Sequence, residues 1–108
     1  MFRMRLKVII AGLLILPGMV SAATEHRVGQ KNRTFSVATL SIKPGERVTF
    51  DNDDTVTHNV YSAHKGNVFN LKAQAPGISS SVTFPTEGTF EIRCAFHPKM
   101  KLLVVVAR

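Results

Sequence analysis

Cysteine is almost missing from this chain of 108 residues, which also has no tryptophan and only one tyrosine. A single cysteine cannot form an intramolecular disulfide, so the chain is not a disulfide-stabilised scaffold. The length leaves room for one domain and excludes a large enzyme with its own cofactor domain. Hydrophobic residues make up 44% and charged residues 19% of the sequence, which excludes an intrinsically disordered composition.

The chain also lacks a long hydrophobic run. Its longest apolar segment, residues 8–16, is shorter than the roughly 20 residues that a membrane-spanning helix needs. Basic residues precede this segment, Pro17-Gly18 interrupts it, and small residues follow at positions 21–23. That order is typical of a secretory signal, with an uncleaved membrane anchor as the alternative. We therefore predict that residues 1–22 are a cleaved signal peptide. Residues 23–108 would then form one domain, exported to the periplasm without membrane insertion.

Acidic residues are the scarcer charge, with 7 Asp and Glu against 14 Lys and Arg. Cleavage after residue 22 would lower the net charge from +7 to +4. The remaining basic residues are spread along the chain without a dense patch of interleaved aromatic residues, so nucleic-acid binding is disfavoured. A mild positive field that attracts acidic protein partners is the better interpretation.

No segment after residue 23 keeps the apolar period of a helix for long. Short alternating segments bounded by Gly, Pro, Asn and Asp instead predict strands at residues 35–42, 47–51, 56–61, 80–84 and 89–94, and the apolar run at residues 102–106 predicts a final buried strand. Pro44-Gly45 has the sequence of a type II turn. Residues 64–78 are typical of a loop, with a short helix near Leu71–Gln74 as an alternative. The fold class predicted from this pattern is all-β, a Greek-key β-sandwich of about six to eight strands.

The one cysteine stands beside other side chains that bind metals. Cys94 ends a predicted strand, and residues 94–100 read Cys-Ala-Phe-His-Pro-Lys-Met, which places Cys94, His97 and Met100 on one tight loop. His58 lies far upstream on another predicted strand. A lone thiol in an exported protein is prone to oxidation unless a metal holds it. One thiolate, two imidazoles and a weak axial thioether form the ligand set of an electron-transfer copper site.

Each of these side chains also has a simpler explanation by itself. Cys94 and Met100 could be core residues, and His97 could be a solvated loop residue. His58 could be hydrogen-bonded to an aspartate in the turn at residues 52–54. The combination favours a metal site, with copper ahead of zinc, because structural zinc sites more often use paired Cys-x-x-Cys ligands and no methionine.

These motifs resemble the cupredoxins, or blue copper proteins, most of all the amicyanin and plastocyanin-like members. The matching stretches are residues 40–50, 58–60, 84–90 and 94–100 with the closing valine strand, and the short Cys-x2-His-x2-Met loop matches the amicyanin pattern. The resemblance implies that His58, Cys94 and His97 are equatorial copper ligands and that Met100 is the axial ligand. It also implies that Asn59 ties the two ligand loops together.

The resemblance further implies a type 1 copper site that holds one copper ion per chain and cycles between Cu(II) and Cu(I). The protein would be a monomeric periplasmic electron carrier and not an enzyme. Its partners would be redox proteins that dock transiently near His97, with a periplasmic dehydrogenase as donor and a c-type cytochrome as acceptor. The alternative is a periplasmic protein that delivers the copper ion itself. A Cys94–His97 hydrolase is disfavoured, since the motif offers no third orienting group and no oxyanion donors.

Overall fold

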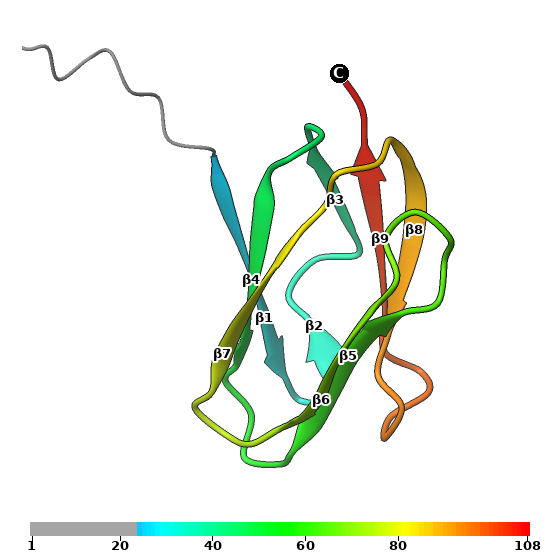
Figure 1. Ribbon diagram of the computed structural model, residues 1–108. Coiled ribbons are helices and arrows are strands. Elements are labelled where there is room, and N and C mark those ends of the chain that lie inside the picture. Colours follow the sequence, from blue (N-terminus) through cyan, green and yellow to red (C-terminus); the bar gives the residue numbers. More distant parts are fainter. Residues whose placement is uncertain (1–23) are drawn as a thin grey trace, which may run out of the picture.

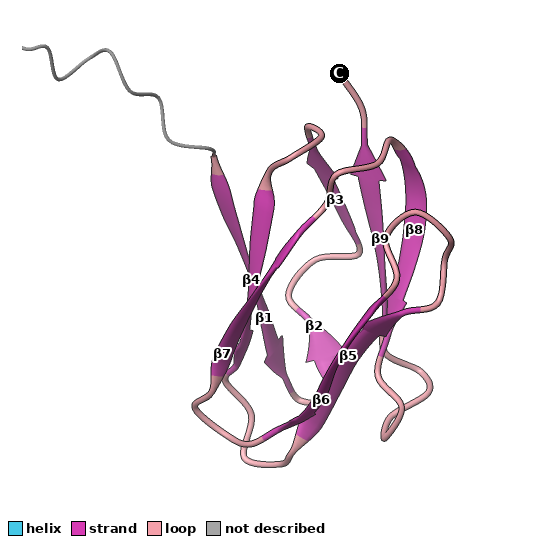
Figure 2. Cartoon of the chain, viewed as in Figure 1, coloured by secondary structure: helices cyan, strands magenta, loops and turns pink. Residues whose placement is uncertain are grey.

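The computed structural model describes residues 24–108, so the predicted signal peptide lies outside the described residues. Residues 24–108 form nine strands and no helix, and thus provide no helical membrane span (Figures 1 and 2). In chain order the strands are β1 (Glu25–Lys31), β2 (Thr34–Phe35), β3 (Thr39–Ile42), β4 (Arg47–Asn52), β5 (His58–Ser62), β6 (Phe69–Gln74), β7 (Ser79–Thr83), β8 (Gly88–Arg93) and β9 (Lys101–Val106).

The strands form two sheets that enclose the core. The smaller sheet has the order β2-β1-β4-β7 and the larger sheet has the order β3-β9-β8-β5-β6 (Figure 2). Most neighbouring strands are antiparallel, but β1 pairs with β4, and β3 with β9, in parallel. The predicted all-β sandwich is confirmed, with nine strands in the described range rather than six to eight.

Two predictions for individual segments are wrong. The single strand predicted at residues 35–42 is two strands, because the chain leaves the smaller sheet after β2 and enters the larger sheet at β3. The interpretation of residues 64–78 as a loop, and the alternative of a short helix near Leu71–Gln74, are both wrong for Phe69–Gln74, which form β6. The register between β5 and β6 shifts between Asn59 and Tyr61, and Lys72 has a left-handed φ of 63°. The sequence of β6 alternates apolar and polar residues as a strand does, but the left-handed Lys72 interrupts the matching alternation in burial, so that Ala73 is exposed and Gln74 is buried.

Aromatic residues from both sheets fill the middle of the core. Phe50 on β4 is fully buried and packs against Phe35 and Phe69, with ring centroids 6.4 Å away in each case. Phe69 on β6 in turn packs edge-on against Phe84, with ring centroids 5.7 Å apart. Close-packed interiors of this kind have low compressibility, so the strands hold their ends in fixed relative positions.

The antiparallel pairing of β5 and β8 determines where the metal-ligating residues meet. Tyr61 on β5 lies opposite Arg93 on β8, so β5 begins at the end of the sheet where β8 finishes. His58 is the first residue of β5, and Cys94 directly follows β8. The loop from β8 to β9, drawn in orange, closes the same end of the sandwich (Figure 1). Two distant parts of the sequence are thereby brought to one edge.

The predicted type II turn at Pro44-Gly45 is confirmed. Gly45 has a φ of 88°, which an L side chain adopts only at a cost, and the Glu46 N–H donates to the Lys43 carbonyl at 3.1 Å. The turn leads directly into β4, whose other end, at Asn52, begins the turn at residues 52–54 that precedes His58.

Candidate metal centre

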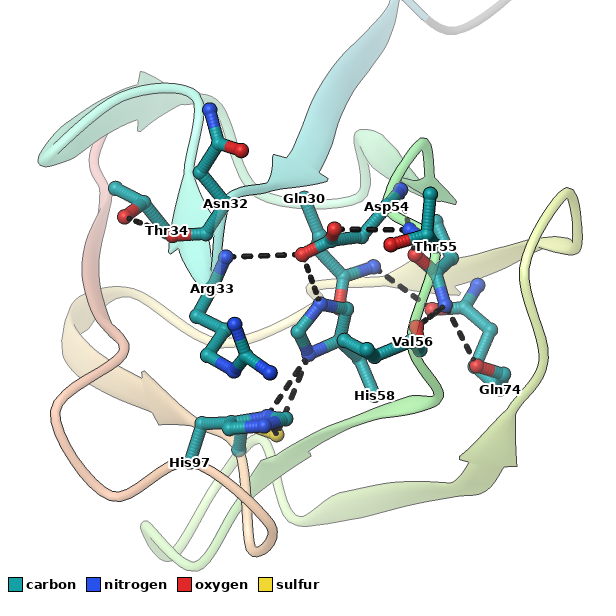
Figure 3. A network of polar contacts seen from close by, with 12 residues as sticks. Gln30, Asn32, Arg33, Thr34, Asp54, Thr55, Val56, His58, Gln74 and His97 are labelled. Atoms are coloured by element: carbon teal, nitrogen blue, oxygen red, sulfur yellow. Dashed lines mark hydrogen bonds and ion pairs between the residues drawn. The ribbon is translucent and has the colours of Figure 1, made fainter.

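Three ligating side chains converge at this end of the sandwich. The Cys94 Sγ lies 4.0 Å from His58 Nδ1 and 3.8 Å from His97 Nδ1, and the two Nδ1 atoms are 3.1 Å apart (Figure 3). His58 is fully buried, Cys94 is 1% exposed, and His97 is partly buried. The structure thus brings together the thiol and both imidazoles that the resemblance implies as equatorial ligands.

The spacing of these atoms fits a bound metal ion. With bonds of about 2.0 Å to nitrogen and about 2.3 Å to sulfur, trigonal coordination puts the nitrogens about 3.5 Å apart and each about 3.7 Å from the sulfur. The distances among His58, Cys94 and His97 agree with this arrangement to within a few tenths of an ångström. One thiolate with two imidazoles is a soft ligand set that suits copper.

Met100 lies at the end of the same loop. Its side chain is 2% exposed and belongs to the buried core together with Cys94. The Met100 N–H donates to the His97 carbonyl at 2.9 Å, which closes the loop into a tight turn immediately before β9. The backbone thus keeps Met100 next to His97, and its role as the axial ligand remains a prediction.

Asn59 joins the two segments that carry the ligating residues. Its Oδ1 accepts a hydrogen bond from the Ala95 N–H at 3.0 Å, and its own backbone N–H donates to Cys94 Sγ at 3.3 Å. Its Nδ2 donates to Asn70 Oδ1 and to the Lys72 carbonyl, at 2.8 and 3.0 Å. These bonds to β6 fix which end of the amide faces Ala95. The predicted tie between the ligand loops is therefore present. The irregular part of β6, around Lys72, supplies the acceptors that hold the Asn59 amide in place.

The imidazole of His58 uses both of its nitrogens. Its Nδ1 faces Cys94 and His97, whereas its Nε2 lies 2.9 Å from Asp54 Oδ2 (Figure 3). The hydrogen bond to a turn aspartate and the convergence on a metal position were alternatives at the level of sequence, and the structure shows both together. Hydrogen bonds from the Arg33 N–H, from His58 and from the Thr55 N–H hold the pKa of the Asp54 carboxyl well below its ordinary value.

The imidazole of His97 is closer to the surface. Desolvation lowers the pKa of His97 below its ordinary value, and the nearby charges of His58 and Arg33 lower it further. The neutral imidazole, which is the form that binds a metal, is therefore favoured over the protonated form. Of the two histidines at the centre, only His97 is partly exposed to solvent.

The other two histidines of the chain lie elsewhere. His26 Nε2 contacts Glu46 Oε1 at 2.9 Å, and His64 packs edge-on against Phe90. Within residues 24–108, the only cluster of three His, Cys, Asp or Glu side chains suited to a metal is His58, Cys94 and His97. Sequence reasoning offered a turn aspartate as a hydrogen-bond partner of His58 only in place of a metal, and it did not identify Asp54 as that aspartate. Its separation of four residues from His58 is the one signal that could have indicated the contact.

The fold and the cluster define a class of protein, a β-sandwich with a mononuclear Cys-His-His metal centre at one end. The family model of the copper binding proteins, plastocyanin/azurin family, matches residues 22–107. The chain belongs to this family, that is, to the cupredoxins. The cofactor is accordingly a copper ion, one per chain, and the expected resemblance is confirmed. Comparison with curated protein sequences finds no match.

Solved structures agree with the family assignment. A purple cupredoxin from Nitrosopumilus maritimus is 28% identical, with a TM-score of 0.69 over 76% of this chain and 99% of that chain. Amicyanin from Paracoccus versutus is 25% identical, with a TM-score of 0.69 over 83% of this chain and 87% of that chain. A copper-containing nitrite reductase from Thermus scotoductus SA-01 is 20% identical, with a TM-score of 0.76 over 88% of this chain and 25% of that chain. The last likeness concerns the fold alone.

Proposed function

We propose that this cupredoxin is an electron carrier with a type 1 copper site, in which His58, Cys94 and His97 are equatorial ligands and Met100 is the axial ligand. The observation that carries the proposal is the convergence of one buried thiol and two imidazole nitrogens within 4.8 Å of one another. When bound, copper supplies a one-electron couple, Cu(II) + e⁻ ⇌ Cu(I), with the electron taken from one redox protein and passed to another.

The surrounding residues suit this role because they hold the ligands in one geometry. Asn59 bonds to the backbone beside Cys94, and Asp54 bonds to the far nitrogen of His58. A centre that needs little rearrangement between its two oxidation states exchanges electrons readily, and hydrogen bonds to the ligands supply that rigidity. Nothing in the role requires a bond to a substrate, so we propose a carrier and not an enzyme.

The proposed setting is the periplasm, reached by means of the signal peptide predicted at residues 1–22. The proposed partners are soluble redox proteins, with a dehydrogenase as donor and a c-type cytochrome as acceptor. The protein would work as a monomer that meets each partner briefly, because a carrier must leave one partner before it can reach the next.

Loading the purified protein with Cu(II) tests the proposal. An intense blue absorption band from thiolate charge transfer, with narrow copper hyperfine splitting in electron spin resonance, is the expected result. The reduced protein should then keep its Cu(I) when it is challenged with a strong Cu(I) chelator, because buried Cys94 and Met100 retain the ion. Rapid loss of Cu(I) would favour copper delivery, and a colourless Cu(II) protein would exclude the carrier.

The surface around His97 suggests how partners dock. Arg33, Phe96, His97, Pro98 and Lys99 line a depression of about 320 Å³, and Phe96 is 53% exposed. An apolar floor with two cationic residues and no carboxylate suits a partner whose contact surface is apolar and rimmed with acidic residues. Electron transfer would pass through the ring of His97.

We expect Lys99→Glu to slow oxidation of the reduced protein by hexacyanoferrate(III), an anion, about threefold to tenfold at low salt. Reduction of the Cu(II) protein by the cation hexaammineruthenium(II) should become faster. Stopped-flow kinetics at two ionic strengths measures both rates, and salt should shrink the difference. Lys43→Glu makes the same charge change at the other end of the sandwich and serves as the control. Equal effects of the two variants would contradict docking at His97.

A further inference from the structure

Asp54 is a nearly buried carboxylate next to a proposed copper ligand. Its side chain is 9% exposed and lies between His58 and the turn that joins β1 to β2 (Figure 3). Its Oδ2 accepts hydrogen bonds from the Arg33 N–H and from His58 Nε2, both at 2.9 Å, and its Oδ1 accepts one from the Thr55 N–H at 2.8 Å. The carboxylate is thus fully hydrogen-bonded in its ionised form.

Within residues 24–108, no Lys or Arg side chain forms an ion pair with the Asp54 carboxylate. Among residues 24–108, His58 is the only ion-pair partner of Asp54, and Arg33 reaches it with its backbone N–H. A buried charge is costly unless another charge compensates it. Cys94 and His97 converge on the opposite edge of the same imidazole, at Nδ1. A cation at that position would therefore supply the missing compensation.

The hydrogen bond also decides which nitrogen of His58 is free. An ionised carboxylate only accepts hydrogen bonds, so a neutral His58 must carry its proton on Nε2. The lone pair of Nδ1 then faces the ligand cluster. Asn32 and Arg33, with φ of 53° and 55°, form the two-residue hairpin turn between Lys31 and Thr34 that aims the Arg33 N–H at Asp54.

We propose that Asp54 is a positioning residue that presets the His58 imidazole for copper and places a negative charge one hydrogen bond beyond the ligand, which stabilises Cu(II) relative to Cu(I). The inference rests on the proposed role of His58 as a ligand. It adds that the hairpin of the smaller sheet, through Arg33 and Asp54, tunes a centre whose ligands all extend from the larger sheet.

Asp54→Asn tests the charge at almost constant shape. We expect Cu(II) affinity to fall about 10-fold to 100-fold, as is usual for lost partners of ligating histidines. With Cu(I) affinity retained, this corresponds to a rise in reduction potential of about 60–120 mV, at 59 mV for each factor of ten. Asp53→Asn removes the same charge from the exposed neighbouring residue and should change neither quantity more than about twofold. Asp54→Glu keeps the charge, so its reduction potential should stay closer to the wild-type value than that of Asp54→Asn.

Nitrogen-15 NMR of the metal-free wild-type protein provides a measurement that needs no variant. His58 Nε2 should carry a proton that it donates to Asp54, and an unprotonated Nε2 would overturn the proposal. An unchanged potential in a blue Asp54→Asn protein would also overturn it while leaving the carrier function intact. A wild-type protein that stays colourless with Cu(II) would instead refute the proposed function, which keeps the two failures distinguishable.

Discussion

Copper-loaded Cys94→Ser is expected to be colourless. The blue band of a type 1 site arises from charge transfer out of a copper-bound thiolate, and a serine hydroxyl neither ionises readily nor matches the softness of sulfur. Cys94 is the only cysteine of the chain, so no other thiolate can replace it. Cu(II) affinity should also fall, by about 100-fold or more, because the strongest of the proposed ligands is lost. Visible absorption and a competitive Cu(II) titration measure the two effects.

The matched control for this variant is His64→Gln, which removes a histidine outside the centre. His64 is exposed and packs against Phe90, so its replacement should leave the colour and the affinity unchanged. The fold of Cys94→Ser should persist, since burying a hydroxyl in place of the thiol costs only about 1–3 kcal/mol. A blue Cys94→Ser protein, or a His64→Gln protein without colour, would contradict the proposed ligand set.

Asn59→Ala is expected to destabilise the metal-free protein by about 2–3 kcal/mol. The change removes three side-chain hydrogen bonds at a position that is 3% exposed, and it leaves the Ala95 N–H without its acceptor. For a domain of this size, the melting temperature should fall by about 10–20 °C. The loop after Cys94 would also lose its tie to β5, so the loaded variant should release Cu(II) to a chelator about tenfold faster.

Asn67→Ala is the control for the loss of a buried asparagine. Asn67 is 6% exposed and its Nδ2 makes one hydrogen bond, to the Thr86 carbonyl, away from the copper centre. Its replacement should cost about 1 kcal/mol and should not alter copper release. Equal stability losses in the two variants, or unchanged copper release in Asn59→Ala, would show that Asn59 does not brace the ligand loop.

The local part of the centre could be predicted from the sequence because its spacing is short. Cys94 and His97 are three residues apart on a loop between an alternating strand and a continuous apolar strand, and the loop itself brings them together. His58 could be included only through the resemblance to a known family and the combination of residue types. Its actual approach to Cys94 depends on the pairing of β5 with β8, which no periodicity reveals.

Three features could not be predicted from the sequence: the contact of Asp54 with His58, the strand β1, and the crossing between the sheets after β2. Asp54 looks like any turn aspartate, and its contact with His58 depends on where the hairpin turn at Arg33 sits. The strand β1 has few apolar residues and is recognised only through its parallel pairing with β4. The crossing between β2 and β3 leaves only a change of phase in the alternation, from Phe35 and Val37 to Leu40 and Ile42. The axial role of Met100 and the cleavage of residues 1–22 remain predictions.

The parallel pairing of β3 with β9 has a consequence for how the protein folds. Thr39 lies opposite Leu103, so the larger sheet needs contacts between residues near the two ends of the described chain. Such high contact order slows folding to about milliseconds or seconds, because the entropy of closing long loops is lost before the contacts form. A chain still emerging from the ribosome lacks β9 and cannot complete this sheet. Delayed folding of this kind would suit the export proposed above, because a translocation channel admits an unfolded chain. Metal uptake would then follow only after the last strand has docked.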